Sequence, residues 1–112
     1  MGREVEKADR FVEVALRKAV KEGEGTIVFV GTTRLALFES EGQVYCIKNS
    51  CPHAGGFLGL GTQKGCKVIC PRHEWAFDLT DGSCDTDPRY SVKHYEVKIE
   101  EGRIRVGVPE GF

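Results

Sequence analysis

Two pairs of side chains in this sequence could bind a metal together. Cys51 and His53 are separated by one proline, and Cys70 and His73 follow after sixteen further residues as Cys-Pro-Arg-His. A thiolate and an imidazole one or two residues apart can reach one metal centre from a single tight loop. Two such loops placed side by side would complete a four-ligand site. The pattern therefore predicts a metal centre at Cys51, His53, Cys70 and His73.

Two kinds of centre use two thiolates and two imidazoles. One is tetrahedral zinc, and the other is a [2Fe–2S] cluster in which one iron takes two cysteines and the other takes two histidines. Zinc-finger modules pair Cys with Cys and His with His. In this sequence each loop supplies one of each, which favours two irons side by side. A structural zinc site remains the alternative.

The segments that flank these loops have the pattern of β-hairpins. Runs rich in β-branched residues, alternation of apolar and polar residues, and Glu-Gly turns all point to short strands. These flanking segments, which form the frame of the domain, are predicted to contain strands at residues 26–30, 34–39, 43–48, 92–100 and 103–108. Between them, residues 49–91 hold three of the four prolines and four of the five cysteines, with short strands predicted at 67–69 and 76–79. A frame of hairpins that carries a loop-rich insert is a common way to mount a site.

Length and composition indicate one ordinary globular domain. The chain has 112 residues, of which 40% are hydrophobic and 29% charged, and its net charge is −1. Such a balance gives no argument for a nucleic-acid or membrane partner, and no apolar run approaches the roughly 18 residues that span a bilayer. Residues 1–9 form a charged lead-in without a secretory signal, so we expect a cytoplasmic protein. An odd number of cysteines argues against a disulfide framework.

The ligand spacing and its surroundings resemble a known family. C-x-H, sixteen residues, then C-x-x-H, within CPHAGG and CPRHEWAFDLTDG, is similar to the signature of Rieske [2Fe–2S] proteins, in particular bacterial and archaeal Rieske ferredoxins and the small subunit of assimilatory nitrite reductase. The resemblance covers residues 10–108 and leaves 109–112 as a tail. It implies an all-β fold, an antiparallel β-sandwich with a small cluster-binding subdomain inserted at about 49–91. It also implies that Cys51 and Cys70 bind a buried iron, and that His53 and His73 bind an outer one.

Departures from the family pattern bear on the reduction potential. High-potential Rieske proteins have a disulfide between the loops, and the corresponding positions here are Gly56 and Arg72. They also place a serine and a tyrosine hydroxyl near the cluster sulfurs, where this chain has Trp75 and Phe77, which we expect to pack in the core. Hydrogen bonds to sulfur raise the potential, so we predict a value near the low end of the Rieske range, around −150 mV. By the same resemblance, Asp87–Tyr90 is a third loop that covers the cluster.

The resemblance implies a one-electron carrier that holds one [2Fe–2S] cluster and passes electrons between a reductase and a terminal oxygenase or other redox enzyme. Partners are expected to dock near His53 and His73. One alternative is the small subunit of a nitrite reductase-like complex, and a structural zinc-binding module is another. An enzyme acting alone is not favoured, because a Rieske oxygenase needs a second iron on a 2-His-1-carboxylate triad in a further domain.

Four other Cys and His residues receive structural interpretations. Cys46 lies in a predicted strand and is expected to be a small buried apolar residue, and His94, also in a strand, is expected to be structural. Cys66 and Cys84 lie in or near the insert, and a disulfide between them remains open.

Overall fold

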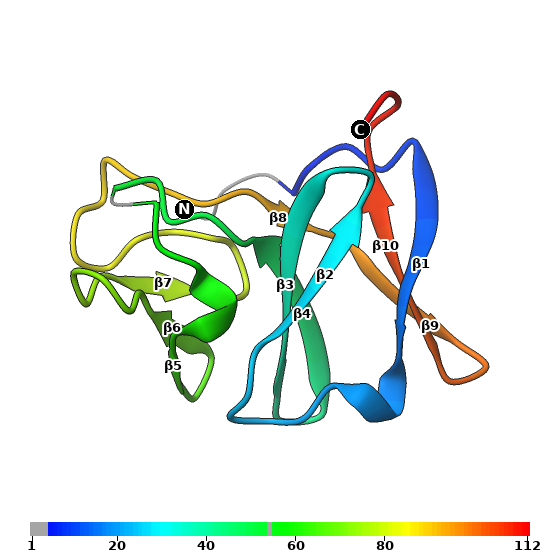
Figure 1. The fold of residues 1–112 in the computed structure, drawn as a ribbon, viewed down its shortest axis with the longest axis horizontal. Coiled ribbons are helices and arrows are strands. Elements are labelled where there is room, and N and C mark those ends of the chain that lie inside the picture. The colour runs from blue at the N-terminus through cyan, green and yellow to red at the C-terminus, as the bar shows by residue number, and fades with distance from the viewer. Residues whose placement is uncertain (1–4, 54) are drawn as a thin grey trace.

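The computed structural model describes residues 5–53 and 55–112, and in that part of the chain the fold consists of three antiparallel sheets (Figure 1). The first sheet has the strand order β1-β10-β9, the second β2-β3-β4-β8, and the third β5-β6-β7. The elements are β1 (Arg10–Leu16), η1 (Arg17–Ala19), β2 (Thr26–Val30), β3 (Thr33–Ser40), β4 (Gln43–Lys48), η2 (Leu58–Leu60), β5 (Thr62–Lys64), β6 (Lys67–Ile69), β7 (Ala76–Asp78), β8 (His94–Tyr95), β9 (Val97–Glu100) and β10 (Arg103–Val108). The predicted all-β, antiparallel class is confirmed.

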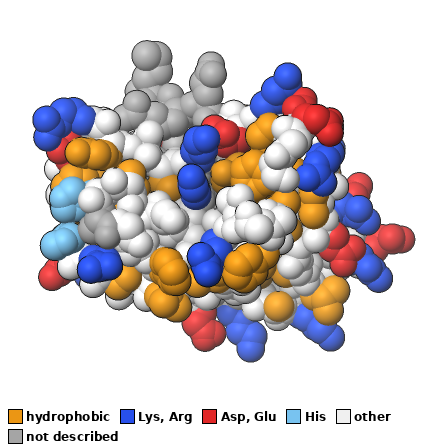
Figure 2. Space-filling model, turned by 45° about the horizontal axis from the view of Figure 1, so that its top comes forward, with side chains coloured by type: hydrophobic (Ala, Val, Ile, Leu, Met, Phe, Trp, Pro, Cys, Tyr) orange, Lys and Arg blue, Asp and Glu red, His pale blue; other side chains and the backbone are white. Residues whose placement is uncertain are grey.

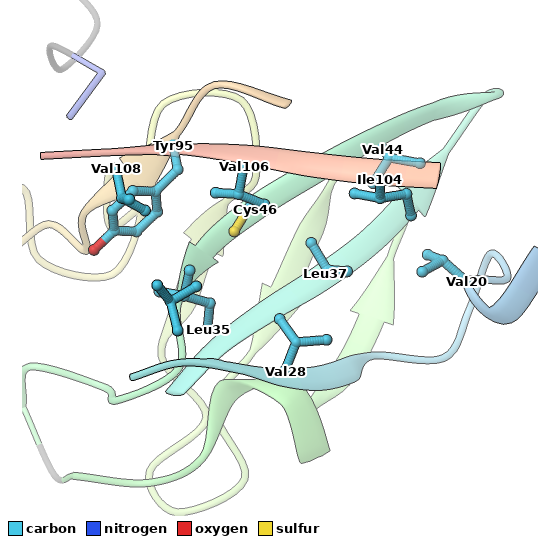
Figure 3. Close-up of a cluster of buried hydrophobic side chains, with 11 residues drawn as sticks. Val20, Val28, Leu35, Leu37, Val44, Cys46, Tyr95, Ile104, Val106 and Val108 are labelled. Atoms are coloured by element: carbon cyan, nitrogen blue, oxygen red, sulfur yellow. The ribbon is translucent and has the colours of Figure 1, made fainter. Parts of the chain in front are cut away.

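The first two sheets form a sandwich around the main core. Buried side chains from β2, β3, β4 and β8 meet those of β10, and Tyr95 and Cys46 lie among aliphatic residues (Figure 3). The fully or nearly fully buried members are Val20, Val28, Val30, Leu35, Leu37, Val44, Cys46, Tyr95, Ile104, Val106 and Val108. Burial of this apolar surface is the main stabilising contribution of the frame.

The β3–β4 hairpin is buried on both of its faces, and this explains its long apolar run. Leu35 and Leu37 point into the main core, whereas the alternate residues Ala36 and Phe38 belong to a second core. Successive strand side chains point to opposite faces, so a strand between two cores needs apolar residues at every position. The second sheet is therefore the shared wall between the sandwich and the inserted subdomain.

The inserted subdomain leaves the frame after β4 and returns at β8. It contains the third sheet, which lies beside the sandwich (Figure 1). Its own core packs against the shared wall. Its fully buried residues include Leu58, Val68, Phe77 and Leu79. The insert predicted at about 49–91 thus has its own small sheet.

Most predicted strands are found, with one error. Strands at 26–30, 43–48, 67–69 and 103–108 have the predicted bounds. The single strand predicted over 92–100 is wrong, because that segment divides at Glu96 into β8, which pairs with β4, and β9, which pairs with β10. The alternation of apolar and polar residues continues through the break, although Tyr95 in β8 is buried while in β9 Val97 is partly buried and Ile99 is 44% exposed. The sequence pattern also predicted no strand at β1 and missed β5 and η2.

The N-terminal lead-in was predicted over residues 1–9, and residues 1–4 lie outside the described part. Of the remainder, the Glu6 N–H donates to the carbonyl of His94 at 2.9 Å and the Asp9 N–H to that of Val108 at 2.9 Å. Within residues 5–53 and 55–112 no helix is long and apolar enough to span a membrane.

Candidate metal centre

The two ligand loops repeat the same backbone hydrogen bonds. In the first loop, the Cys51 N–H donates to the carbonyl of Gly56 at 2.9 Å, and the Cys51 carbonyl accepts from the Gly55 N–H at 2.8 Å. In the second loop, the Cys70 N–H donates to the carbonyl of Trp75 at 2.7 Å, and the Cys70 carbonyl accepts from the Glu74 N–H at 3.0 Å. Each cysteine is therefore held at the base of a loop closed in the same register.

The fourth residue after each cysteine has a left-handed backbone. Gly55 has φ of 69° and Glu74 has φ of 56°. Glycine adopts this conformation without cost, whereas for glutamate it is uncommon. Since Glu74 takes the same positive φ as Gly55, the two loops resemble each other in this backbone angle as well as in their ligand types.

Burial divides the four predicted ligands into an inner and an outer pair. Cys51 is 2% exposed and Cys70 is fully buried, and both belong to the subdomain core. His53 and His73 are exposed, with ring centroids 5.1 Å apart and ring planes at 73°. Figure 2 shows histidine side chains gathered at one end of the molecular surface. The two loops thus lie side by side, with the thiols inside and the imidazoles at the surface.

Trp75 and Tyr90 extend the site beyond the four predicted ligands. The indole of Trp75 stacks on the His53 ring, with centroids 3.9 Å apart and planes at 9°. The Tyr90 ring lies 5.2 Å from Trp75 and 6.3 Å from His53, centroid to centroid. Phe77 is fully buried, as predicted. For Trp75 the prediction of a core residue is only half right: it packs against the subdomain core while one face covers His53.

The other cysteines and the third histidine lie elsewhere. Cys46 is 1% exposed in the main core, and burial raises the pKa of its thiol. No disulfide joins any of the five cysteines, so Cys66 and Cys84 are not paired. His94 lies in β8, where burial lowers the pKa of its imidazole.

The donor set fits a two-iron cluster. In a Rieske [2Fe–2S] group, each iron has two protein ligands: thiolates at one iron and imidazoles at the other. A buried pair of thiols behind an exposed pair of imidazoles, carried by matching loops, has that division.

Comparison with known proteins agrees with this arrangement. The sequence pattern of the Rieske [2Fe-2S] domain matches residues 10–105. The ferredoxin component of the naphthalene 1,2-dioxygenase system of Pseudomonas putida is 32% identical over 98 residues, with 87% of this chain and 94% of that protein covered.

Two solved structures have the same fold. A protein described as an NADH-dependent nitrite reductase small subunit, from Mycobacterium tuberculosis, superposes with a TM-score of 0.80 at 30% identity, with 89% of this chain and 96% of that chain covered. A chain in the complex of reduced oxygenase and oxidized ferredoxin of carbazole 1,9a-dioxygenase superposes with a TM-score of 0.80 at 26% identity, with 91% and 96% covered. From the matched domain and from these relatives, the chain belongs to the Rieske [2Fe-2S] domain family.

Proposed function

We propose that this protein is a one-electron carrier of the ferredoxin type, with one Rieske [2Fe–2S] cluster bound by Cys51, His53, Cys70 and His73. The observation that carries the proposal is the pair of matching loops, each of which buries a thiol and exposes an imidazole. When bound, the cluster supplies a site that accepts and returns one electron. A carrier must keep such a group from bulk solvent and still bring it close to a partner's surface.

The chain's own residues divide these two tasks. Cys51 and Cys70 lie in the subdomain core, where the thiolates would bind the inner iron out of contact with water. His53 and His73 are exposed, so they would bind the outer iron at the surface where a partner can approach. Electron-transfer contacts are typically small and transient, and an edge formed by two imidazoles suits such a contact.

The partners we propose are a reductase that donates the electron and a terminal oxygenase that receives it, both docking at the His53–His73 edge. Support comes from the dioxygenase-system ferredoxin that the chain resembles and from the matched chain in an oxygenase–ferredoxin complex. A cytoplasmic location remains a prediction, which cell fractionation would test.

A second candidate function is that of a small subunit in a nitrite reductase-like complex, favoured by the match at 30% identity to the nitrite reductase small subunit. The two functions differ in assembly. A carrier, when pre-reduced, should transfer electrons to an isolated oxygenase component and should purify without a stable partner. A subunit should co-purify with a large reductase chain from its native cells.

The proposed ligands are tested by metal analysis, visible absorption and low-temperature EPR on the purified protein. We expect two irons per chain, little zinc, and a reduced-state average g value below that of all-cysteine clusters. Alanine at Cys51 or Cys70 should abolish the cluster, whereas Cys66→Ala, which changes a half-buried thiol in the same subdomain, should retain it. One zinc per chain and no iron, in protein produced with iron and sulfide in excess, would overturn the proposal.

A further inference from the structure

Trp75 reaches from the second ligand loop to a histidine of the first. It follows His73 by two residues, yet its indole stacks on His53 at 3.9 Å and 9°. The terminal torsion of a histidine side chain is broad, with weak preferences of its own. An exposed His53 would therefore be free to turn unless a neighbour limited it. The flat contact with Trp75 limits that rotation and removes water from one face of the imidazole.

Trp75 is itself fixed by backbone hydrogen bonds and by packing against the subdomain core. Its carbonyl accepts the Cys70 N–H at 2.7 Å, which fixes its backbone to the base of the second loop. The next residue, Ala76, begins β7, and its N–H donates to Oγ1 of Thr86 at 3.1 Å. The indole also packs against the subdomain core. Both the backbone and the side chain of Trp75 are therefore placed by the fold rather than by the contact with His53.

The third loop also contacts the indole, and its Tyr90 ring lies near both Trp75 and His53. Tyr90 meets Trp75 edge to face, with centroids 5.2 Å apart and planes at 66°, a favourable aromatic geometry. The loop is braced internally, because the carboxylate of Asp87 accepts from Nε and Nη2 of Arg89 at 3.0 and 2.7 Å. The Asp87 N–H in turn donates a hydrogen bond to Sγ of Cys84 at 3.4 Å.

The two histidines differ in the number of aromatic side chains that contact them. In the described part of the chain, the aromatic neighbours of His53 are Trp75, Tyr90 and His73, whereas His73 has His53 as its one aromatic neighbour. A ligand that is already oriented loses less conformational freedom on binding, and residues that orient metal ligands commonly set metal affinity.

We propose that Trp75 is a positioning residue for His53, which fixes the ring orientation in which His53 binds the outer iron and ties the first ligand loop to the second. This rests on the proposed function, since it takes His53 as a cluster ligand. Tyr90 supports Trp75 in that role. The consequence is that cluster retention and the electronic environment of the outer iron depend on an aromatic face at position 75.

The test uses the cluster-loaded protein and four variants. Trp75→Leu removes the aromatic face, Trp75→Phe keeps it, and Tyr90→Leu removes the support. Phe29→Leu is the control, because Phe29 is an aromatic residue 57% exposed on β2. The measurements are the rate at which visible cluster absorption is lost in the presence of a chelator, the midpoint potential, and the EPR g values with histidine nitrogen hyperfine couplings.

We expect Trp75→Leu to lose the cluster at least about 10-fold faster than wild type, in line with the effect of residues that orient metal ligands, with a shifted potential and altered nitrogen couplings. Trp75→Phe should restore most of the retention, Tyr90→Leu should fall between, and Phe29→Leu should match wild type. If Trp75→Leu does not fold, the same measurements on Trp75→Phe and Tyr90→Leu test the positioning role.

The positioning role would be overturned if every folded Trp75 and Tyr90 variant kept the cluster as long as wild type, with the same potential and the same nitrogen couplings. That result is distinguishable from failure of the proposed function, because the latter would already appear as an absence of two irons and of the Rieske EPR signal in the wild-type protein.

Discussion

Gly56 of the first ligand loop lies against Cys70 of the second. A β-carbon added at Gly56 would stand 3.0 Å from Sγ of Cys70 and 2.8 Å from Cγ of Arg72. Contacts this short force a neighbour to move. The distance between the two loops, and with it the space around the inner thiol, is therefore set by a glycine.

Gly56→Ala should reduce both cluster occupancy and stability. Overpacking of a tight site typically costs about 1–3 kcal/mol, so we expect fewer irons per chain and a lower free energy of unfolding, measured by iron analysis and chemical denaturation. The double variant Gly56→Ala with Arg72→Ala separates the two contacts. Recovery of iron in the double variant would assign the effect to Arg72, and full iron occupancy in Gly56→Ala itself would contradict the close approach to Cys70.

The reduction potential should lie near the low end of the Rieske range, around −150 mV. Trp75 and Phe77 carry no hydroxyl, and Phe77 is fully buried in the subdomain core. Phe77→Tyr introduces a hydroxyl at a position where high-potential relatives have one, so it should raise the potential, because a hydrogen bond to sulfur stabilises the added electron. A redox titration followed by EPR measures both values. A wild-type potential above about +100 mV, within the same range, would refute this reasoning.

Gln63 connects the inserted subdomain to the frame. From β5, its Nε2 donates to the carbonyl of Glu39 at 2.6 Å, and its Oε1 accepts from the Gly23 N–H at 3.0 Å. Gln63→Leu removes both hydrogen bonds, one exposed and one partly buried. It should lower the free energy of unfolding by about 0.5–1.5 kcal/mol and speed hydrogen exchange in β5–β7. Gln43→Leu, at an exposed position of β4, is the matched control. Equal effects of the two substitutions would argue against the connection.

Cys46 should be unreactive and dispensable for the cluster. It is 1% exposed, and burial raises the pKa of its thiol, so little thiolate is available for alkylation. Cys46→Ala should keep two irons per chain and lower the free energy of unfolding by about 1 kcal/mol, a typical core substitution. Iodoacetamide labelling followed by mass spectrometry should modify Cys66, which is half-buried, before Cys46. Loss of iron in Cys46→Ala would contradict the ligand assignment.

His94 should make folding less favourable in mild acid. Burial lowers the pKa of its imidazole below the ordinary value of 6.5, against the opposite influence of the Asp81 and Glu6 carboxylates. The unfolded chain therefore takes up a proton at a pH where the folded protein does not. The associated stability is present above about pH 6.5 and is lost as the pH falls below it.

His94→Gln removes that titration. Its melting temperature should consequently decline less than that of wild type between pH 7.5 and pH 5.5, as measured by thermal denaturation in the same buffers. Parallel declines in the two proteins would show that His94 does not contribute.

The frame could be predicted well because its signals are local. The run from Thr26 to Val30 and the Glu41-Gly42 turn before Gln43–Lys48 carry their own strand and turn preferences, and those elements have the predicted bounds. The segment 92–100 could not be divided from its pattern. Alternation tells which side chains share a face, but the change of partner from β4 to β10 depends on neighbours that are distant in the sequence.

By itself, the sequence determined the four proposed ligands and the family, because the residue types and the spacing of the two Cys-Pro segments can be read without any tertiary contact. The family resemblance implied an inner pair of thiols and an outer pair of imidazoles, and the tertiary structure places them so; only the tertiary structure decided that Trp75 stacks on His53. The physical reason is that burial and ring contacts arise between segments some twenty residues apart, which meet only when the third sheet packs against the shared wall of the sandwich.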